Sequence, residues 1–299
     1  MDLRVLQYFL AVAREQSISA AAKSLHLSQP TLSTQLKALE EELGKQLLLR
    51  GTKGSRKVTL TEEGMTLRKR AQEILELVRM TESEISLSDD AVAGDVYIGM
   101  GESDMIRLFA RTAKGLQEKY PDIHYHILSG NAAFVQEYLE RGLIDFGVIY
   151  SPVDTSVYSS IKIPVHDIWG VLMRRDAPLA KKEKIRPQDL WDKPLIVSAQ
   201  RADAWPMAQW FERDVTELKI VATYNLVFNA SLMVDEGMGY ALCFDKLINV
   251  TGQSNLCFRP LEPQMTAEAS IIWKRYQVFS KAAQKFIDAL RESCERPIG

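Results

Sequence analysis

Residues 17–43 read SISAAAKSLHLSQPTLSTQLKALEEEL, and they decide the fold of the first part of the chain. Ser19 is a residue type that caps helix N-termini, and the three alanines at 20–22 let a second helix pack at close range. Ser28 offers a second cap, and Pro30 suits the first turn of a helix, where a backbone N–H would have no helical partner anyway. The stretch therefore predicts two short helices joined by a tight turn, the second beginning just after Ser28.

The second helix has one apolar side and one polar side. Its leucines recur at spacings of four, three and four and share one stripe: Leu32, Leu36, Leu39 and Leu43. The opposite side comprises Pro30, Thr34, Lys37 and Glu41, flanked by Thr31 and Ser33. Hydroxyl and amide groups come first along the helix, and such groups hydrogen-bond base edges in the major groove of DNA, whereas Glu41 would be repelled by phosphates. The pattern predicts that the N-terminal half enters the groove; from spacing alone, an ordinary helical hairpin is the alternative.

A basic hairpin is predicted after this helix. Residues 47–50 and 57–60 have strand character and flank a turn at 51–54 that contains glycine. Its basic residues are Arg50, Lys53, Arg56 and Lys57, as expected of a loop that lies on a phosphate backbone or in a minor groove. Residues 1–60 carry nine Lys or Arg against five Asp or Glu, whereas the rest of the chain is net negative. This asymmetry favours a polyanion-binding surface at the N-terminus, although a solvated basic loop also fits it.

The first 64 residues resemble the winged helix-turn-helix of the LysR-type transcriptional regulators. The resemblance rests on LQYFLAVAREQSISAAAKSLHLSQPTLSTQLKALEEELGKQLLLR at 6–50 and VTLTEEG at 58–64. It implies a bacterial activator or repressor that binds an interrupted dyad in double-stranded DNA, with RNA polymerase as a further partner of an activator. The chain departs from the family at Thr34, where Arg is usual, and at Leu48, where Phe is usual. The first departure removes a phosphate or guanine contact, and the second is a core exchange.

The polar helix face and the basic hairpin together give a predicted set of DNA contacts. This set comprises Ser28, Gln29, Pro30, Thr31, Ser33, Thr34, Lys37, Arg50, Lys53, Arg56 and Lys57.

Length and composition indicate a soluble protein of two or three domains. At 299 residues the chain exceeds one typical core, and no stretch approaches the ~20 apolar residues that a membrane span needs. The N-terminus leads directly into an amphipathic helix and shows no export signal. Cys243, Cys257 and Cys294 have no metal-ligand spacing and suit a reducing compartment. We therefore expect a cytoplasmic protein with no membrane partner.

Residues 61–88 contain no proline and predict a long helix. Their less polar positions alternate by four and three: Leu67, Ala71, Ile74, Val78, Thr81, Ile85 and Ser88. Such a heptad seam packs one helix against another in a coiled coil. Dimerisation suits a DNA-binding protein because two-fold symmetry doubles the number of its base contacts. The alternative is a solitary helix laid on its own domain. The family resemblance extends to this segment and implies dimers through the linker helix, often paired into tetramers.

Strands alternate with helical patterns after the linker, which is typical of parallel α/β sheets. The expected strands are 95–100, 124–128, 146–150, 169–173, 195–198, 220–224, 240–244 and 270–273. Their order resembles the effector domain of the same family, which is folded like a two-lobed periplasmic binding protein of type 2. The resemblance implies two chain crossovers, near 163–164 and 263–267.

The predicted fold class is therefore α/β overall, in three parts. Residues 1–60 form an all-α winged helix-turn-helix domain with its motif at about 18–37, residues 61–90 a linker and dimerisation helix, and residues 91–299 a two-lobed α/β effector domain. The first lobe comprises 91–163 and 267–299, and the second comprises 164–266.

A small molecule between two such lobes would contact the carboxyl ends of the strands, where helix N-termini present free N–H groups. On that logic the lining residues are Gly101, Glu102, Ser103, Ser129, Gly130 and Asn131 in the first lobe, and Ser198, Gln200, Arg201, Asn225 and Phe244 in the second. Any one of Ser103, Asp104 and Asn131 can instead simply cap the helix that follows it. Glu102 and Asp104 beside a helix N-terminus argue against a small dianion as ligand, whereas Arg201 is compatible with a single carboxylate.

The remaining reactive side chains have structural explanations. His124 and His126 share a face of one strand, but no third metal ligand accompanies them. Cys243 lies in the apolar run YALCF, which favours a buried thiol over a redox switch. Trp191, Trp205 and Trp210 are expected to pack the second lobe; the alternative for Trp205, which follows Arg201 closely, is a place at the border of the pocket. No GxSxG, P-loop or HExxH pattern is present, so no catalytic residue, metal site or cofactor is predicted.

The sequence as a whole favours a sequence-specific DNA-binding transcriptional regulator that a small-molecule effector controls, and not an enzyme. Two other classes remain open: a solute-binding protein without gene control, and an architectural DNA protein that binds by charge alone. The N-terminal helices and the missing export signal argue against the first class. The modest positive charge and the long α/β part argue against the second.

Overall fold

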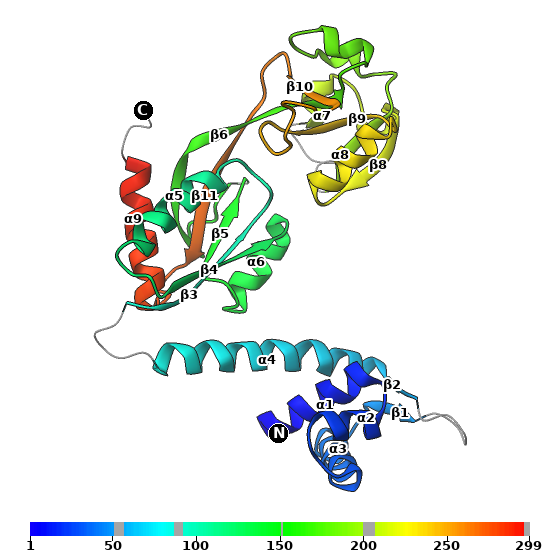
Figure 1. Cartoon of the computed structure of the whole chain (residues 1–299), viewed down its shortest axis with the longest axis vertical. Helices are drawn as coiled ribbons and strands as arrows, with labels where there is room; N and C mark the ends of the chain where they lie inside the picture. Colours follow the sequence, from blue (N-terminus) through cyan, green and yellow to red (C-terminus); the bar gives the residue numbers. More distant parts are fainter. Residues whose placement is uncertain (51–56, 87–91, 151, 200–206, 296–299) are drawn as a thin grey trace. The chain divides into compact units, whose positions relative to one another are not determined.

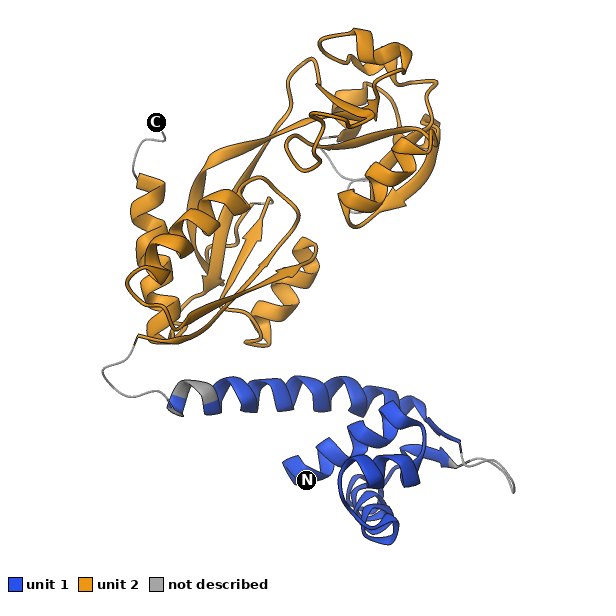
Figure 2. Cartoon of the chain, in the orientation of Figure 1, with its two compact units in different colours: residues 1–89 blue, residues 90–299 orange. Residues whose placement is uncertain are grey.

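The computed structural model describes residues 1–50, 57–86, 92–150, 152–199 and 207–295. The chain forms two compact units, Met1–Asp89 and Asp90–Gly299, which Figure 2 distinguishes by colour. A helical N-terminal part is followed by strands that alternate with helices, so the predicted α/β fold class is confirmed (Figure 1). Within the described ranges, no helix has both the length and the apolar character that a membrane crossing requires.

The first unit begins with α1 (Leu3–Glu15), α2 (Ile18–Ser24) and α3 (Gln29–Leu43). The expectation that Ser19 caps α2 is wrong. The cap is Ser17, whose Oγ accepts a hydrogen bond from the Ala20 backbone N–H at 3.3 Å. The helix starts earlier than predicted because Ile18 is buried in the core of the unit and so belongs to the first turn, whereas Ser19 is exposed.

The cap and most of the buried stripe predicted for α3 are confirmed. The Ser28 Oγ accepts a hydrogen bond from the Thr31 backbone N–H at 3.2 Å, and Gly44, with a φ of 63°, ends the helix in the left-handed region. The buried leucines of the stripe are Leu32, Leu36 and Leu39. Leu43 is 42% exposed, contrary to the prediction, because the helix ends directly after it and Leu47 and Leu48 complete the core instead.

The predicted hairpin is present as β1 (Leu48–Arg50) and β2 (Val58–Leu60), which pair antiparallel. The Glu40 carboxylate of α3 accepts hydrogen bonds from the backbone N–H groups of Leu47 and Leu48, at 2.8 and 3.0 Å. The hairpin is therefore fixed to α3 by charge-assisted hydrogen bonds at its first strand.

The linker helix is α4 (Glu62–Ser86), close to the predicted 61–88; Ser88 lies outside the described residues. Its two halves differ in exposure. Ala71 is fully buried, and Leu67 packs against the core of the three helices. Farther along the seam, Val78 is half-buried, Thr81 is exposed and Ile85 is 78% exposed. The first half of the predicted seam thus packs on its own unit, and the last described part of the seam is open to solvent.

The second unit contains two joined sheets, which we call lobe 1 and lobe 2 (Figure 1). The sheet of lobe 1 has the order β4-β3-β5-β11-β6. Its strands are β3 (Gly94–Met100), β4 (Ile123–Ser129), β5 (Phe146–Ile149), and parts of β6 (Tyr158–Arg174) and β11 (Thr266–Lys274). Figure 1 shows α5 (Ile106–Gln117) and α9 (Lys281–Glu295) on one face and α6 (Ala132–Glu140) on the other. Phe109, Phe146 and Phe286 lie fully buried between the sheet and the first two of these helices.

Lobe 2 is built on the second half of β6, which pairs antiparallel with β9 (Tyr240–Phe244) and with β10 (Leu256–Pro260). β7 (Leu195–Ser198) lies parallel to both β9 and β8 (Ile220–Tyr224). The helical segments of the lobe are η1 (Pro178–Lys181), η2 (Pro187–Asp189), α7 (Met207–Phe211), η3 (Val215–Glu217) and α8 (Val227–Asp235). Two apolar clusters fill the lobe on the two sides of its sheet.

All eight expected strands are present, but β6 and β11 are several residues longer than expected and one further strand was not predicted. β7, β8 and β9 have the bounds that the sequence predicts. β6 continues without interruption through Pro164 and joins the lobes, and β11 pairs with it on both sides of a register shift between Glu268 and Ser270. β10, which was missed, lies at the edge of lobe 2 and pairs with β6, and its short sequence LCFRP has no strict alternation of apolar and polar residues.

Candidate functional site

The polar face of α3 is open to solvent, as predicted. Its exposed residues are Gln29, Pro30, Thr31, Thr34 and Lys37, and Ser33 is half-buried. The hydroxyl groups form hydrogen bonds within the helix and its cap. Ser28 Oγ and Thr31 Oγ1 lie 2.7 Å apart, and Thr34 Oγ1 donates to the Pro30 carbonyl at 2.9 Å. A hydroxyl that donates within the helix keeps lone pairs that can accept from a base.

Gln29 and Lys37 differ from these hydroxyl residues. Within the described part of the chain, neither side chain has a hydrogen-bond or ion-pair partner. The Gln29 amide can both donate and accept, and the Lys37 ammonium can only donate. The face therefore combines one group suited to reading a base edge with one suited to a phosphate.

The predicted basic hairpin is described only in part. The Arg50 backbone lies in β1 opposite Val58, and Lys57 is exposed directly before β2. Lys53 and Arg56, which we also predicted to contact DNA, lie outside the described residues. The described strands hold the two ends of this loop next to each other at the edge of the first unit.

The predicted ligand contacts of lobe 1 lie together at one edge of its sheet. Met100 of β3 stands opposite Ser129 of β4, and the Gly130 N–H donates to the Met100 carbonyl at 3.0 Å, so the segments that follow the two strands are neighbours. Two of these residues also have structural roles. The Asn131 side chain accepts from the Phe134 backbone N–H at 2.8 Å and caps α6. A Cβ at Gly130 would stand 2.0 Å from the Phe134 ring, so a larger residue at this position would require the ring to move.

The predicted contacts of lobe 2 also gather at strand ends. Ser198 of β7 stands opposite Tyr224 of β8, and the Ala199 N–H donates to the Tyr224 carbonyl at 2.9 Å, which leaves Asn225 exposed beside them. The Phe244 ring at the end of β9 lies 5.4 Å from the Tyr150 ring of lobe 1. Gln200, Arg201 and Trp205 lie outside the described residues.

One hydrogen bond joins the two sets of strand ends. The Glu102 carboxylate, in the loop after β3, accepts a hydrogen bond from the Val227 backbone N–H at the start of α8. Burial raises the pKa of the Tyr224 hydroxyl, and the nearby Cys243 and the negative charge of Glu102 raise it further. The structure therefore brings residues from both lobes into one region, as the predicted ligand site requires.

The neighbouring Ser103 holds a buried carboxyl group that the sequence reading missed. Its Oγ donates to Asp167 Oδ2 at 2.6 Å, and the Tyr150 hydroxyl donates to the same oxygen at 2.6 Å. Asp167 is only 3% exposed, and burial raises the pKa of its carboxyl although both hydroxyl hydrogen bonds lower it. The signal that could have revealed this group is the single carboxyl residue inside the otherwise apolar end of a long strand, in HDIWGVLM.

Asp104 completes the contacts of this loop. Its carboxylate lies 2.6 Å from Arg107 Nε and 3.8 Å from Lys246 Nζ, which belongs to the loop after β9 in lobe 2. Three consecutive side chains, at 102, 103 and 104, thus contact α8, β6 and the β9 loop in turn. Lys246 was not among the predicted residues. The arrangement links the lobes through hydrogen bonds and charge, which suits ligand-controlled movement between them.

Several histidine, cysteine and tryptophan side chains for which we predicted structural roles pack or form hydrogen bonds within the second unit. His126 Nε2 lies 2.6 Å from Asp95 Oδ1, and its ring stacks on Tyr97 at 4.5 Å. Cys243 is buried, and burial raises the pKa of its thiol to about 12. Trp191 and Trp210 pack in the main cluster of lobe 2, as predicted. Among the described residues, no group of three or more His, Cys, Asp or Glu side chains could hold a metal ion.

Comparison with known proteins agrees with this arrangement. The family model "Bacterial regulatory helix-turn-helix protein, lysR family" matches residues 3–65, and the model "LysR substrate binding domain" matches residues 89–295. The HTH-type transcriptional regulator BsdA of Bacillus subtilis (strain 168) is 30% identical over 294 residues, which is 96% of this chain and 99% of BsdA. AlsR of the same organism is 32% identical over 209 residues, 69% of this chain and 66% of AlsR.

Solved structures share the fold. Full-length CbnR, crystallised with its target DNA, superposes with a TM-score of 0.78 at 19% identity, covering 98% of this chain and 100% of CbnR. Full-length BenM superposes with a TM-score of 0.52 at 25% identity, covering 98% of this chain and 96% of BenM. The two family models span the helix-turn-helix unit and the two-lobed unit, in the order that the structure gives them. The chain therefore belongs to the LysR family of bacterial helix-turn-helix transcriptional regulators.

Proposed function

We propose that this LysR-type regulator binds an interrupted dyad in double-stranded DNA with two copies of its first unit, and that a small molecule bound between lobe 1 and lobe 2 controls it. In this proposal, residues 1–60 bind DNA, residues 61–90 join the copies and residues 91–299 bind the effector. The single observation that carries the proposal is the open polar face of α3, on which the side chains of Gln29 and Lys37 are exposed.

The DNA contacts that we propose are those of the α3 face and the basic hairpin. The N-terminal half of α3 enters the major groove, where Gln29 reads a base edge and Lys37 contacts a phosphate. Thr34 donates its hydroxyl to the Pro30 carbonyl and so supplies no long cationic contact where relatives usually have Arg. The preferred bases of this chain therefore differ from those of relatives that carry Arg at this position.

The partner that we propose for α4 is the α4 of a second copy. Val78 and Ile85 are apolar seam residues, half-buried and exposed respectively, on a helix whose first half already packs on its own unit. Exposed apolar side chains at heptad spacing are stabilised when an identical helix covers them, and the two-fold axis of such a pair matches a dyad in DNA. Pairs of these dimers would form the tetramers that the family resemblance implies, and an activator would also contact RNA polymerase. We place the protein in the cytoplasm, where its DNA is.

The effector site that we propose lies at the strand ends on both sides of the Glu102–Val227 hydrogen bond. Ser129, Asn225 and Phe244 line it from the two lobes, together with the other predicted residues there. Since Glu102 already supplies a carboxylate to the N-terminus of α8, a second anion at this helix end would meet like charge. The effector therefore occupies the strand ends and not the end of α8. It acts by preferring one arrangement of the lobes, with a coupling of about 1 to 3 kcal/mol.

Selection of fragments from the source genome by the purified full chain tests the DNA proposal. We expect a small set of fragments that share a dyad and that remain preferred as salt is raised, because base contacts persist when counterion release weakens all binding equally. Uniform loss of all fragments with salt would indicate an architectural protein instead. The genes beside the selected fragments then supply candidate effectors. Footprints that stay identical under saturating amounts of an effector that binds would contradict the switching part of the proposal.

A further inference from the structure

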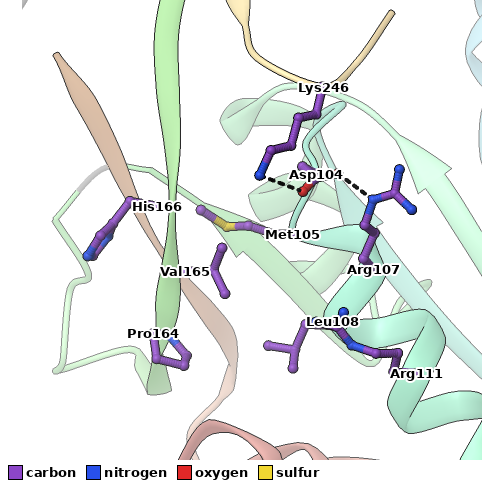
Figure 3. A pocket seen from close by; sticks show the side chains of 9 residues that line it. All are labelled: Asp104, Met105, Arg107, Leu108, Arg111, Pro164, Val165, His166 and Lys246. Carbon is purple, nitrogen blue, oxygen red and sulfur yellow. Dashed lines mark hydrogen bonds and ion pairs between the residues drawn. The ribbon is translucent and has the colours of Figure 1, made fainter. Parts of the chain in front are cut away.

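A pocket of about 370 Å³ lies beside the β6 segment that joins the two lobes (Figure 3). It is bounded by the start of α5, by residues 164–166 of β6 and by Lys246 from lobe 2. None of the strand-end residues that we propose for the effector site lines it. This hinge pocket is thus separate from the proposed effector site, and its volume is within the range of about 300–1,000 Å³ that small-molecule sites have.

The hinge pocket has an apolar floor. Met105 and Leu108 of α5 are 1% and 6% exposed, and Pro164 and Val165 of β6 face them (Figure 3). Such a floor favours a ligand with a compact hydrocarbon body, because burying apolar surface gains about 25 cal/mol per Å². No side-chain donor or acceptor from these four residues competes for the ligand.

The rim of the hinge pocket is basic. Arg107, Arg111 and Lys246 line it, and Asp104 is the carboxylate among its lining residues. Asp104 is already shared between Arg107 and Lys246, at 2.6 and 3.8 Å. Within the described residues, Arg111 has no carboxylate partner. Its guanidinium is therefore available to an anion, and a planar guanidinium binds a carboxylate in two parallel hydrogen bonds.

His166 adds a further nitrogen to the rim. It stands opposite Glu268 of β11, and Glu268 is itself paired with Lys162 at 2.6 Å. The carboxylate opposite His166 is thus already paired with a lysine. The excess of positive charge around the pocket remains with Arg111.

We propose that the hinge pocket binds a small organic anion, a carboxylate on a compact apolar body, at a site separate from the strand ends. The apolar floor holds the hydrocarbon body, and Arg111 and Lys246 hold the carboxylate. Because Lys246 belongs to lobe 2 and the floor belongs to lobe 1 and β6, the bound anion contacts both lobes and favours the arrangement seen here. This inference does not depend on the effector proposed for the strand ends.

Calorimetric titration of the full chain with phenylacetate tests the proposal, with phenylacetamide as the neutral compound of the same shape. We expect saturable binding of phenylacetate with a Kd below about 1 mM and at least tenfold weaker binding of phenylacetamide, since the rim recognises charge. Arg111→Gln is expected to weaken phenylacetate binding about tenfold, and Lys246→Gln at least threefold. Lys114→Gln is the matched control, because Lys114 is an exposed cation of the same helix that does not line the pocket; its effect should stay within twofold.

Three results would overturn the proposal. The first is no saturable binding of phenylacetate at 10 mM, roughly ten times the expected limit for the Kd. The second is an equal affinity for phenylacetamide and phenylacetate, which would show that the positive charge of the rim does not contribute to binding. The third is an equal effect of Arg111→Gln and Lys114→Gln, which would place the anion elsewhere on the protein. Thermal unfolding of each variant without ligand shows whether it is folded, and the three substituted positions are exposed, so all three variants are expected to unfold as the wild type does.

Discussion

The Glu102 carboxylate of lobe 1 accepts a hydrogen bond from the Val227 backbone N–H at the first residue of α8 in lobe 2. Leu226, the N-cap residue of α8, has no side-chain cap of its own. A helix N-terminus carries unpaired N–H groups and partial positive charge, so a carboxylate there satisfies one and offsets the other. The cap of α8 thus comes from the opposite lobe, and the same bond stabilises the helix and the contact between the lobes.

Glu102→Ala is expected to loosen the contact between the lobes, because the Val227 N–H loses its acceptor. The cap loss alone corresponds to about 1 kcal/mol of stability. Pulsed electron resonance between spin labels at Lys114 and Glu236, which are exposed in lobe 1 and lobe 2, should show a longer and broader distance distribution. Glu118→Ala removes an exposed carboxylate at the end of α5 and serves as the control. Equal distributions in both variants would refute the role of Glu102.

Local signals explain why the first unit was predictable from the sequence. Ser28, Pro30 and Gly44 fix the two ends of α3 through contacts within a few residues, and the leucine spacing fixes its buried side. The start of α2 was predicted wrongly because the local signals there do not decide between two caps. Ser17 and Ser19 are both good caps, and the burial of Ile18, a property of the tertiary core, decides between them.

The contacts between the lobes were not predictable in the same way. Asp167 and Ser103 are separated by 64 positions in the chain, and Lys246 meets Asp104 only because β6 joins the two sheets as one continuous strand. No local pattern encodes such pairs. The strand ends were predictable because parallel strands align their carboxyl ends whatever their separation in sequence, which is why the segments at 101–103 and 129–131 were expected to lie in one site.

Asp167→Asn is expected to change the pH dependence of stability. Burial raises the pKa of the Asp167 carboxyl, so the folded chain holds this proton more tightly than the unfolded chain does. The stability that this group contributes is complete below its unfolded pKa of about 3.8 and is lost as pH rises through the folded pKa. The unfolding free energy of the wild type minus that of the variant should therefore fall as pH rises above about 4, in urea titrations followed by tryptophan fluorescence.

Asp154→Asn is the control for this pH dependence, because it predicts the opposite sign. Hydrogen bonds from Ser156 lower the pKa of the exposed Asp154 carboxyl, so its contribution is present at neutral pH and lost as pH falls. All five tryptophans of the chain belong to the second unit, and the fluorescence signal therefore reports the unit that contains both residues. A wild-type-minus-variant difference for Asp167 that rises with pH would contradict the assignment.

Ile85→Glu is expected to dissociate the proposed dimer. Ile85 is 78% exposed on the second half of the α4 seam, and two facing glutamates would place like charges at the centre of the helix pair. Sedimentation equilibrium at micromolar concentration should show the mass of a single chain, and binding to a full dyad should fall to that of a half-site. Gln72→Glu adds the same charge at an exposed position of α4 outside the seam and should leave the mass unchanged. Unaltered assembly of Ile85→Glu would rule out α4 as the interface.

Lys37→Ala is expected to weaken DNA binding to a similar extent on all sequences. The Lys37 side chain is exposed on the polar face of α3, and a phosphate contact carries no base information. Removal of one phosphate contact per α3 should lower the slope of log K against log salt by about 0.9 for each copy bound. Fluorescence anisotropy on an operator and on unrelated DNA, at several salt concentrations, measures both quantities. A loss confined to the operator would instead assign Lys37 to base reading.

Gln29→Ala is expected to change which bases are preferred and to leave the salt slope as it is. The Gln29 amide begins α3 beside the Ser28 cap, where the helix enters the groove, and a side-chain amide pairs with adenine N6 and N7 in a bidentate manner. Discrimination at one operator position per half-site should fall by about 1 to 3 kcal/mol, as measured by competition among operators that differ at single base pairs. Gln35→Ala, on the same helix but farther from its start, is the matched substitution and should leave this position unaffected. If both variants lose affinity equally for every operator, the N-terminal half of α3 does not read bases.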